Sequence, residues 1–147
     1  MSVIDTLIFN RTNSNLVAGD PKGKYDYEDY NRVGSAINYV ASAIGLSGIS
    51  AKTNWVNTDI PRSSDINSIL SDVDTIIRAV GLNNSIPTTY NNLLTITGAN
   101  EVEGALYDAY NMVSRIMRWQ DVNNLQETWD MLDSKQITWG EHFLKPE

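Results

Sequence analysis

The chain has 147 residues, a formal net charge of −7, 20% charged residues and no cysteine. Its eleven Lys and Arg residues are scattered, which argues against a nucleic-acid partner because a surface that follows a phosphate backbone needs clustered basic side chains. The lack of cysteine excludes disulfide scaffolds, thiolate chemistry and zinc sites with Cys ligands, and no stretch approaches the roughly 20 apolar residues of a membrane-spanning helix.

The first 24 residues are predicted to form an N-terminal arm. They open with "MSVIDTLIFNRT", which has no basic region and only a short apolar run, so we expect no signal peptide. Leu7, Ile8 and Phe9 form one strand-like stretch before a series of polar turns. A lone strand cannot satisfy its own backbone donors and acceptors. We therefore expect these three residues to pair with a strand from a loop of the same chain or from a neighbouring subunit.

Residues 25–118 show apolar residues at alternating three- and four-residue steps in three separate runs, which predicts three helices of about 18 residues. Acidic residues in the first turn of the first helix agree with the helix dipole. The residues expected to cap or stop the helices are, in chain order, Gly45; Ser63 or Ser64, with Gly81; and Thr97 or Asn100. Helices that each carry one apolar stripe bury those stripes against one another. The prediction is an all-α, three-helix bundle.

Two long connections join these helices, residues 46–62 and 82–96. Loops of this length usually carry a small element or a function. Their apolar residues Trp55, Ile60 and Leu93–Leu94 are expected to fold back over the ends of the bundle, because a free loop would leave them in water.

The C-terminal tail repeats tryptophan at ten-residue intervals, at Trp119, Trp129 and Trp139. Ten residues of helix leave successive tryptophans about 80° apart, so they would not share one face. We therefore predict three short units of about one helical turn, with Leu132 and Phe143 as further apolar residues, and no uniform continuation of the third helix. Exposed tryptophans favour aggregation, so the rings must dock, either on their own bundle or on a neighbouring subunit.

The sequence offers no recognisable catalytic constellation. Its one histidine, His142, argues against a Ser–His–acid triad and against metal sites with several histidines. Acidic groups occur at helix starts and on the polar side of the second helix: Asp26, Glu28 and Asp29; Asp72 and Asp74; Glu101 and Glu103. Helix starts attract acids through the dipole, so we interpret these groups as solvated faces. We expect no enzymatic activity, no metal and no cofactor.

Three stretches in the same order resemble a small helical module of tail-region structural proteins from phages and prophages of Gram-positive bacteria. They are "YDYEDYNRVGSAINYVA", "KTNWVNTDIPRSSDINSIL" and "LLTITGANEVEGALYDAYNMV". The most specific part is the connector that contains Trp55, Asp59 and Pro61, and the repeated "TW" tail is also similar to endings of such proteins. The resemblance covers about residues 25–118 and implies a virion component of the tail or baseplate without enzymatic activity, in a full phage or a phage-tail-like particle.

The leading hypothesis is therefore a virion structural protein, made in the host cytoplasm, with three parts: an arm (1–24), a bundle (25–118) and a Trp-repeat tail (119–147). Its partners would be other virion proteins and copies of itself, with no nucleic acid and no membrane. The residues predicted to hold these partners are Leu7, Ile8, Phe9, Trp119, Trp129, Leu132, Trp139 and Phe143. The alternative is a carbohydrate-binding module for a bacterial surface glycan, in which the tryptophans would stack on sugar rings.

Overall fold

The structure is a computed structural model that describes the backbone of residues 1–134 and the side chains of residues 1–115 except Tyr90. This range contains helices and no strand, so the predicted all-α class is confirmed for it. The elements are η1 (Val3–Thr6), α1 (Asn13–Val17), η2 (Pro21–Gly23), α2 (Tyr27–Ala43), α3 (Ser63–Ala79), α4 (Tyr90–Leu93) and α5 (Ile96–Ser134). The chain divides into two compact units, Met1–Val113 and Ser114–Glu147.

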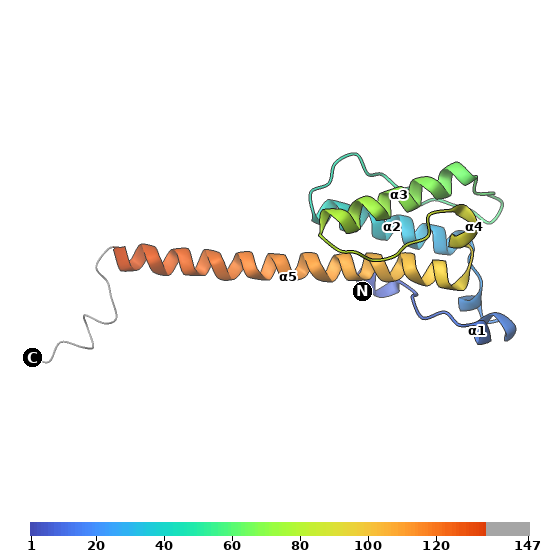
Figure 1. Ribbon diagram of the computed structural model, residues 1–147, viewed down its shortest axis with the longest axis horizontal. Helices are drawn as coiled ribbons and strands as arrows, with labels where there is room; N and C mark the ends of the chain where they lie inside the picture. The colour runs from blue at the N-terminus through green and yellow to red at the C-terminus, as the bar shows by residue number, and fades with distance from the viewer. Residues whose placement is uncertain (135–147) are drawn as a thin grey trace, which may run out of the picture. The chain divides into compact units, whose positions relative to one another are not determined.

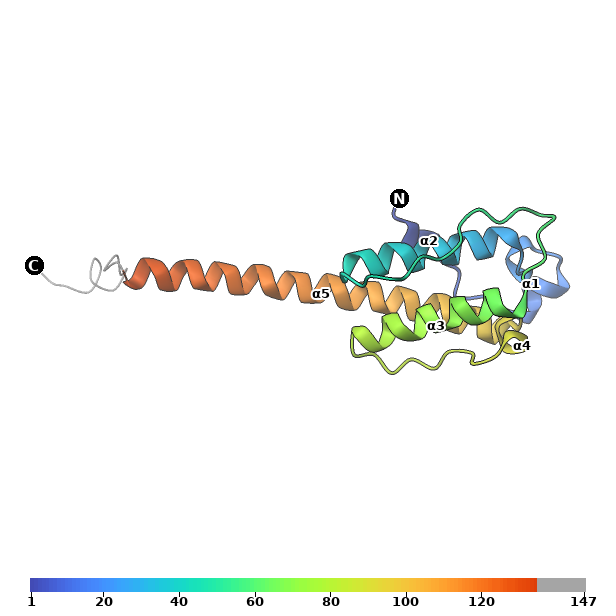
Figure 2. The ribbon, with the colours of Figure 1, turned by 90° about the horizontal axis from the view of Figure 1, so that it is seen from above.

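The core of the first unit lies between α2, α3 and the first part of α5, which are side by side in both views (Figures 1 and 2). The predicted apolar stripes account for it, because each helix turns one row of aliphatic side chains inward. The fully buried residues of these rows include Val33, Ile37 and Val40 of α2, Ile66, Val73 and Ile76 of α3, and Val102, Leu106 and Ala109 of α5.

Two of the predicted helix stops are confirmed, and acidic residues lie in the first turn of α2, as predicted. Asp26 caps α2 by accepting a hydrogen bond from the Glu28 amide, at 2.9 Å. Gly45 and Gly81 follow α2 and α3 with φ of 71° and 74°, a conformation that glycine adopts without steric cost.

Two predicted caps are wrong. The residue before α3 is Arg62, whose amide donates to Asp65, so Ser63 is already inside the helix. Helix α5 starts earlier than expected, and Thr95 accepts a hydrogen bond from the Gly98 amide at 2.9 Å. Several residues near a helix start can act as the cap, and the direction from which the chain enters the helix decides which of them does. The sequence does not give that direction.

Two asparagines, seven residues apart on α2, hold the connection between α2 and α3 along the helix. Asn38 exchanges hydrogen bonds with the backbone N–H and C=O of Ala51, and Asn31 does the same with Trp55. Between them lies Gly34, where an added Cβ would come within 2.3 Å of the Lys52 carbonyl oxygen. The loop can therefore approach α2 only because this position has no side chain.

This attachment explains which loop residues are buried. Trp55 and Leu93 lie in the core, as predicted. Ile60 is 88% exposed and Leu94 is 45% exposed, so the prediction that they cover the bundle is wrong. The hydrogen bonds to α2 end at Trp55, and the chain then turns at Val56–Asp59, which leaves Ile60 beyond the anchored part of the loop.

The N-terminal segment forms no strand, which contradicts the prediction for Leu7–Phe9. Its backbone groups are satisfied by side chains of α5. The Ile8 amide donates to Glu103 at 2.5 Å, and Asn100 bonds both the N–H and the C=O of Arg11, at 3.0 and 2.9 Å. A polar side chain can replace a neighbouring strand as the partner of an extended backbone, so no pairing with a second strand is required here.

Helix α5 runs without interruption from Ile96 to Ser134, so Trp119 and Trp129 are helical and the prediction of separate short units is wrong for residues 119–134. Backbone hydrogen bonds between residues i and i−4 form regardless of the direction in which the tryptophans point. There is also no Gly or Pro between Ser114 and Ser134 to end the helix. The third predicted unit, at Trp139, lies outside the described residues.

Candidate functional site

A buried ion cluster joins the N-terminal segment, α2 and α5. Arg11 donates to Asp29 at 2.8 Å and to Glu103 at 2.6 Å, and Arg32 donates to Glu103 at 2.9 and 3.0 Å and also to Asp29. Glu103 is fully buried and Asp29 nearly so. The interpretation of these two acids as parts of solvated faces is therefore wrong, because each neutralises guanidinium groups inside the protein.

The two positive and two negative charges of this cluster hold one another in place. Burial lowers the pKa of Arg32, but the hydrogen bonds and charges of Glu103 and Asp29 outweigh burial and raise it above its ordinary value. Arg11 also donates to the carbonyl of Ile8. With its charges engaged in this way, the cluster attaches the N-terminal segment to α2 and α5. A pocket lies near the start of α2.

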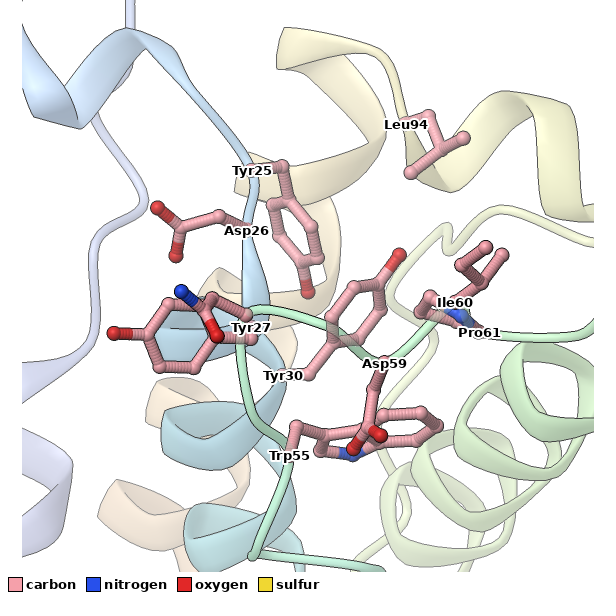
Figure 3. A pocket seen from close by; sticks show the side chains of 10 residues that line it. Tyr25, Asp26, Tyr27, Tyr30, Trp55, Asp59, Ile60, Pro61 and Leu94 are labelled. Atoms are coloured by element: carbon pink, nitrogen blue, oxygen red, sulfur yellow. The ribbon is translucent and has the colours of Figure 1, made fainter.

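That pocket has a volume of about 470 Å³ and lies at the amino end of α2 (Figure 3). We call it the aromatic pocket. Its four rings belong to Tyr25, Tyr27, Tyr30 and Trp55. Asp26, Asn57 and Asp59 add polar groups, and Ile60, Pro61 and Leu94 add apolar ones. The pocket thus combines the start of α2 with the connection that the two asparagines hold.

The rings of Tyr25, Tyr30 and Trp55 are in contact with one another. Tyr25 and Tyr30 meet edge to face with ring centres 5.1 Å apart, and Tyr30 meets Trp55 at 5.5 Å. These are favourable separations for aromatic pairs. The ammonium group of Lys52 lies 3.8 Å from the centre of the Trp55 ring and 3.0 Å from the carboxylate of Asp59. The hydrogen bonds from Lys52 and the Val56 amide lower the pKa of Asp59, so it stays ionised.

Two hydrogen-bond donors of the pocket have no acceptor in the described part of the chain. They are the Tyr25 hydroxyl and the Trp55 indole Nε1, both shielded from solvent. Burial raises the pKa of Tyr25 well above its usual range, and the charges of Glu103 and Asp29 raise it further. The hydroxyl therefore keeps its proton. Unpaired buried donors are uncommon in proteins and call for an explanation.

A second feature is a row of rings on the outside of the first unit, which we call the aromatic row. Phe9 lies 4.9 Å from Tyr107 of α5, and Tyr110, one turn further on, lies 5.7 Å from Tyr39 of α2. Phe9, Tyr39 and Tyr107 are 42%, 44% and 37% exposed. Neighbouring exposed rings of this kind are typical of surfaces that bind other proteins.

The predicted site residues fall in different places. Leu7 is buried in the core of its own unit, Ile8 is half-buried, and Phe9 is exposed in the aromatic row. The three connector residues Trp55, Asp59 and Pro61 come together in the aromatic pocket. Trp119, Trp129 and Leu132 lie in the backbone of α5, but their side chains are outside the described part. Trp139 and Phe143 lie outside the described residues altogether.

Sequence reasoning missed the ion cluster and the roles of Tyr25 and Asn57. Asp29 and Arg32 are three residues apart, a spacing typical of ion pairs on a helix, which was one available signal. Arg11 and Glu103, however, are 92 residues apart, and no local pattern links them. Tyr30 is buried in the core, Tyr25 and Tyr27 pack against it, and all three also line the pocket.

Comparison with known family models, curated proteins and solved structures gives no match to this chain. Among the described residues, no helix is both long enough and apolar enough to cross a membrane. The same residues contain no group of three or more His, Cys, Asp or Glu side chains placed to hold a metal ion. Functional inference therefore starts from the aromatic row, the aromatic pocket and the pattern of α5.

Proposed function

We propose that the chain is a non-enzymatic virion structural protein, a tail or baseplate component that assembles with neighbouring subunits. The observation that carries this proposal is the aromatic row. Tyrosine and phenylalanine rings contribute much of the binding free energy at protein interfaces, because they bury large areas at a small cost in side-chain entropy. Phe9, at one end of the row, belongs to the arm that was predicted from sequence to contact partners.

The pattern of α5 is a second support. Four apolar positions follow one another at steps of three, four and three residues: Val122, Leu125, Trp129 and Leu132. On a helix these steps keep the positions on one side, as in helices that pack against another helix. The proposal includes a three-helix bundle for residues 25–118 and a Trp-repeat tail that binds a neighbouring subunit. The resemblance to phage tail-region proteins points in the same direction.

The test compares the assembly of the full chain with that of two variants, by analytical ultracentrifugation and electron microscopy. Phe9→Ala combined with Tyr107→Ala is expected to keep the helical circular dichroism and to reduce assembly. The control is Leu16→Ala combined with Val17→Ala, which removes two exposed apolar side chains of α1 and should assemble like the unmodified chain. Equal assembly by all three proteins would refute a role for the aromatic row.

Removal of residues 119–147 tests the tail separately. The core residues of the first unit all precede Ser114, so the shortened chain is expected to remain a folded, helical monomer that no longer assembles. If it unfolds, the tail belongs to the core of its own chain and is not a contact to neighbours.

A glycan-binding module remains the second candidate function. The observation that favours it is the aromatic pocket, whose lining residues all belong to the first unit. Binding to a glycan array that is lost in Trp129→Ala, with the fold intact, would instead support the tail as the sugar site.

A further inference from the structure

The spacing of apolar residues in the tail continues back along α5 to two arginines. From residue 115 onward, six positions follow one another at alternating steps of three and four residues: Arg115, Arg118, Val122, Leu125, Trp129 and Leu132. The backbone is helical over this whole range, and on a helix these positions lie within about 100° of one another. We call them the tail stripe. Alternating steps of three and four residues are typical of helices that pair along their length.

The charges in this part of α5 are divided between its two ends. Residues 114–134 carry their two basic residues, Arg115 and Arg118, at the beginning, and three of their four acidic residues towards the end: Glu127, Asp130 and Asp133. Arg115 is exposed and has no hydrogen bond or ion pair with any other residue whose side chain the structure describes. A partner that complements this helix must carry its charges in the reverse order.

The same helix, turned round, has that reverse order. Arg115 and Asp133 lie nine residues before and nine residues after Asn124, and Arg118 and Asp130 lie six residues before and after it. A second copy that runs in the opposite direction and is centred on the same residue therefore places an acid at the level of each arginine. Contacts with this twofold symmetry are the commonest form of association between identical chains.

From this symmetry we propose that the tail stripe binds the tail stripe of a second copy of this chain, with the two helices antiparallel. The positions that oppose each other would be Val122 and Leu125, Arg118 and Trp129, and Arg115 and Leu132 with the adjacent Asp133. A guanidinium group such as that of Arg118 packs favourably on an indole ring. The inference rests on the proposed assembly through the tail, and it names the partner and its direction.

The other arrangements of the tail stripe lack this match. In a parallel pair, Arg115 would face Arg115 and Arg118 would face Arg118 at the contact between the helices, and like charges placed opposite each other weaken association. A different protein could also cover the stripe. Charges that match on reversal are required for antiparallel pairing with a second copy, however, and are not required for binding to another protein.

The charge of Arg115 gives the first test, by sedimentation equilibrium of the full chain at about 0.1 M salt, where charges within about 10 Å still interact. Arg115→Glu should raise the dissociation constant of the dimer at least about tenfold, because two ion pairs become two repulsions. Arg115→Glu combined with Asp133→Arg should restore the dimer. The control is Arg78→Glu, which changes the net charge equally on α3 and should leave the dimer as it is.

Two results of this measurement would overturn the proposal. One is an unmodified chain that stays monomeric, which would mean that the tail stripe binds its own chain or a different protein. The other is a dimer of Arg115→Glu that is as tight as the unmodified dimer or tighter, since removal of arginine strengthens only a parallel pair.

The direction of the helices is tested with spin labels. The chain contains no cysteine, so one introduced cysteine gives one labelled site in each copy. Asn124 and Met131 are seven residues apart and share one side of a helix. In an antiparallel pair the two labels are level at position 124 but about 20 Å apart along the axis at position 131, from the rise of about 1.5 Å per residue. In a parallel pair they are level at both positions.

The distance between labels, measured by pulsed electron paramagnetic resonance, should therefore be longer for Met131→Cys than for Asn124→Cys. Equal distances would overturn the proposal. The variant Phe9→Ala with Tyr107→Ala separates this inference from the proposed function, because it should stop at the dimer with both distances unchanged. If the unmodified chain assembles but shows equal distances and no effect of Arg115→Glu, the antiparallel pairing is wrong and the proposed function stands.

Discussion

The substitution Glu103→Gln is a severe test of the buried ion cluster. The carboxylate of Glu103 is fully buried and accepts hydrogen bonds from the Ile8 amide, from Arg11 and, twice, from Arg32. Glutamine has almost the same shape, but it is uncharged and replaces one oxygen with an NH₂ group that can only donate. The variant would leave the guanidinium groups of Arg11 and Arg32 with the single carboxylate of Asp29. Its NH₂ group would also face other hydrogen-bond donors, with no acceptor opposite it.

The expected loss of stability follows from the burial of these charges. Breaking a buried ion pair by removing one partner costs about 3–5 kcal/mol, a large share of the roughly 5–15 kcal/mol by which a domain is stable. With a urea dependence of about 2 kcal/mol per molar for a domain of this size, the midpoint of unfolding should fall by about 2 M.

The measurement is urea unfolding of the full chain, followed by circular dichroism. Glu101→Gln is the matched control, since it makes the same chemical change two positions earlier on α5 outside the cluster, and it should alter the stability by less than about 0.5 kcal/mol. Replacing both Arg11 and Glu103 with Met should cost less than the sum of the single replacements, because the remaining Arg32 and Asp29 balance each other. A loss below about 1 kcal/mol for Glu103→Gln would show that water or other groups compensate the charges, and would refute the reasoning.

Two further predictions concern the close approach of the loop to α2 and the ion pair beside the pocket. Gly34→Ala should destabilise the protein despite the higher helix propensity of alanine, because its Cβ would lie 2.3 Å from the Lys52 carbonyl oxygen. Gly104→Ala should stabilise the protein by about 0.5–1 kcal/mol, because the nearest atom to its Cβ, on Phe9, is 3.7 Å away. Thermal unfolding compares the two variants, and equal changes in melting temperature would contradict the close approach of the loop to α2. The Asp59 carboxyl, whose pKa is lowered by Lys52, should stabilise the folded state above the ordinary pKa of about 3.9 and lose this effect as the pH falls through the lowered value. Lys52→Met should return the pKa of Asp59 toward the ordinary value in an NMR titration, and an unchanged pKa would exclude the pairing.

Local features could be predicted from the sequence because their causes lie within a few residues. The apolar periodicity of α2 and α3 reports the direction of side chains on a single helix. The acids in the first turn of α2 and the glycines at Gly45 and Gly81 act on the backbone next to them. The large indole of Trp55 has few stable positions outside the core. These elements agree with the structure for that reason.

The aromatic pocket could be predicted only in part. Trp55, Asp59 and Pro61 were recognised as a connector, and they lie together in the pocket. Its other walls come from the start of α2 and from Leu94 after α4. Asn31 and Asn38 bind the backbone of the connection at Trp55 and Ala51 and hold it along α2. An asparagine on a helix has many possible partners, and the sequence does not indicate which loop it will hold.

The helical class, the ends of α2 and α3 and the inward row of each helix followed from local sequence patterns. The contact of Glu103 with Arg11, the burial of Leu7 beside the exposed Phe9, and the exposure of Ile60 became visible only in the folded chain. The physical difference is one of range. Periodicity and caps depend on neighbouring residues, whereas the partner of a charge or of an extended backbone is set by whichever distant segment the packing of the helices brings beside it.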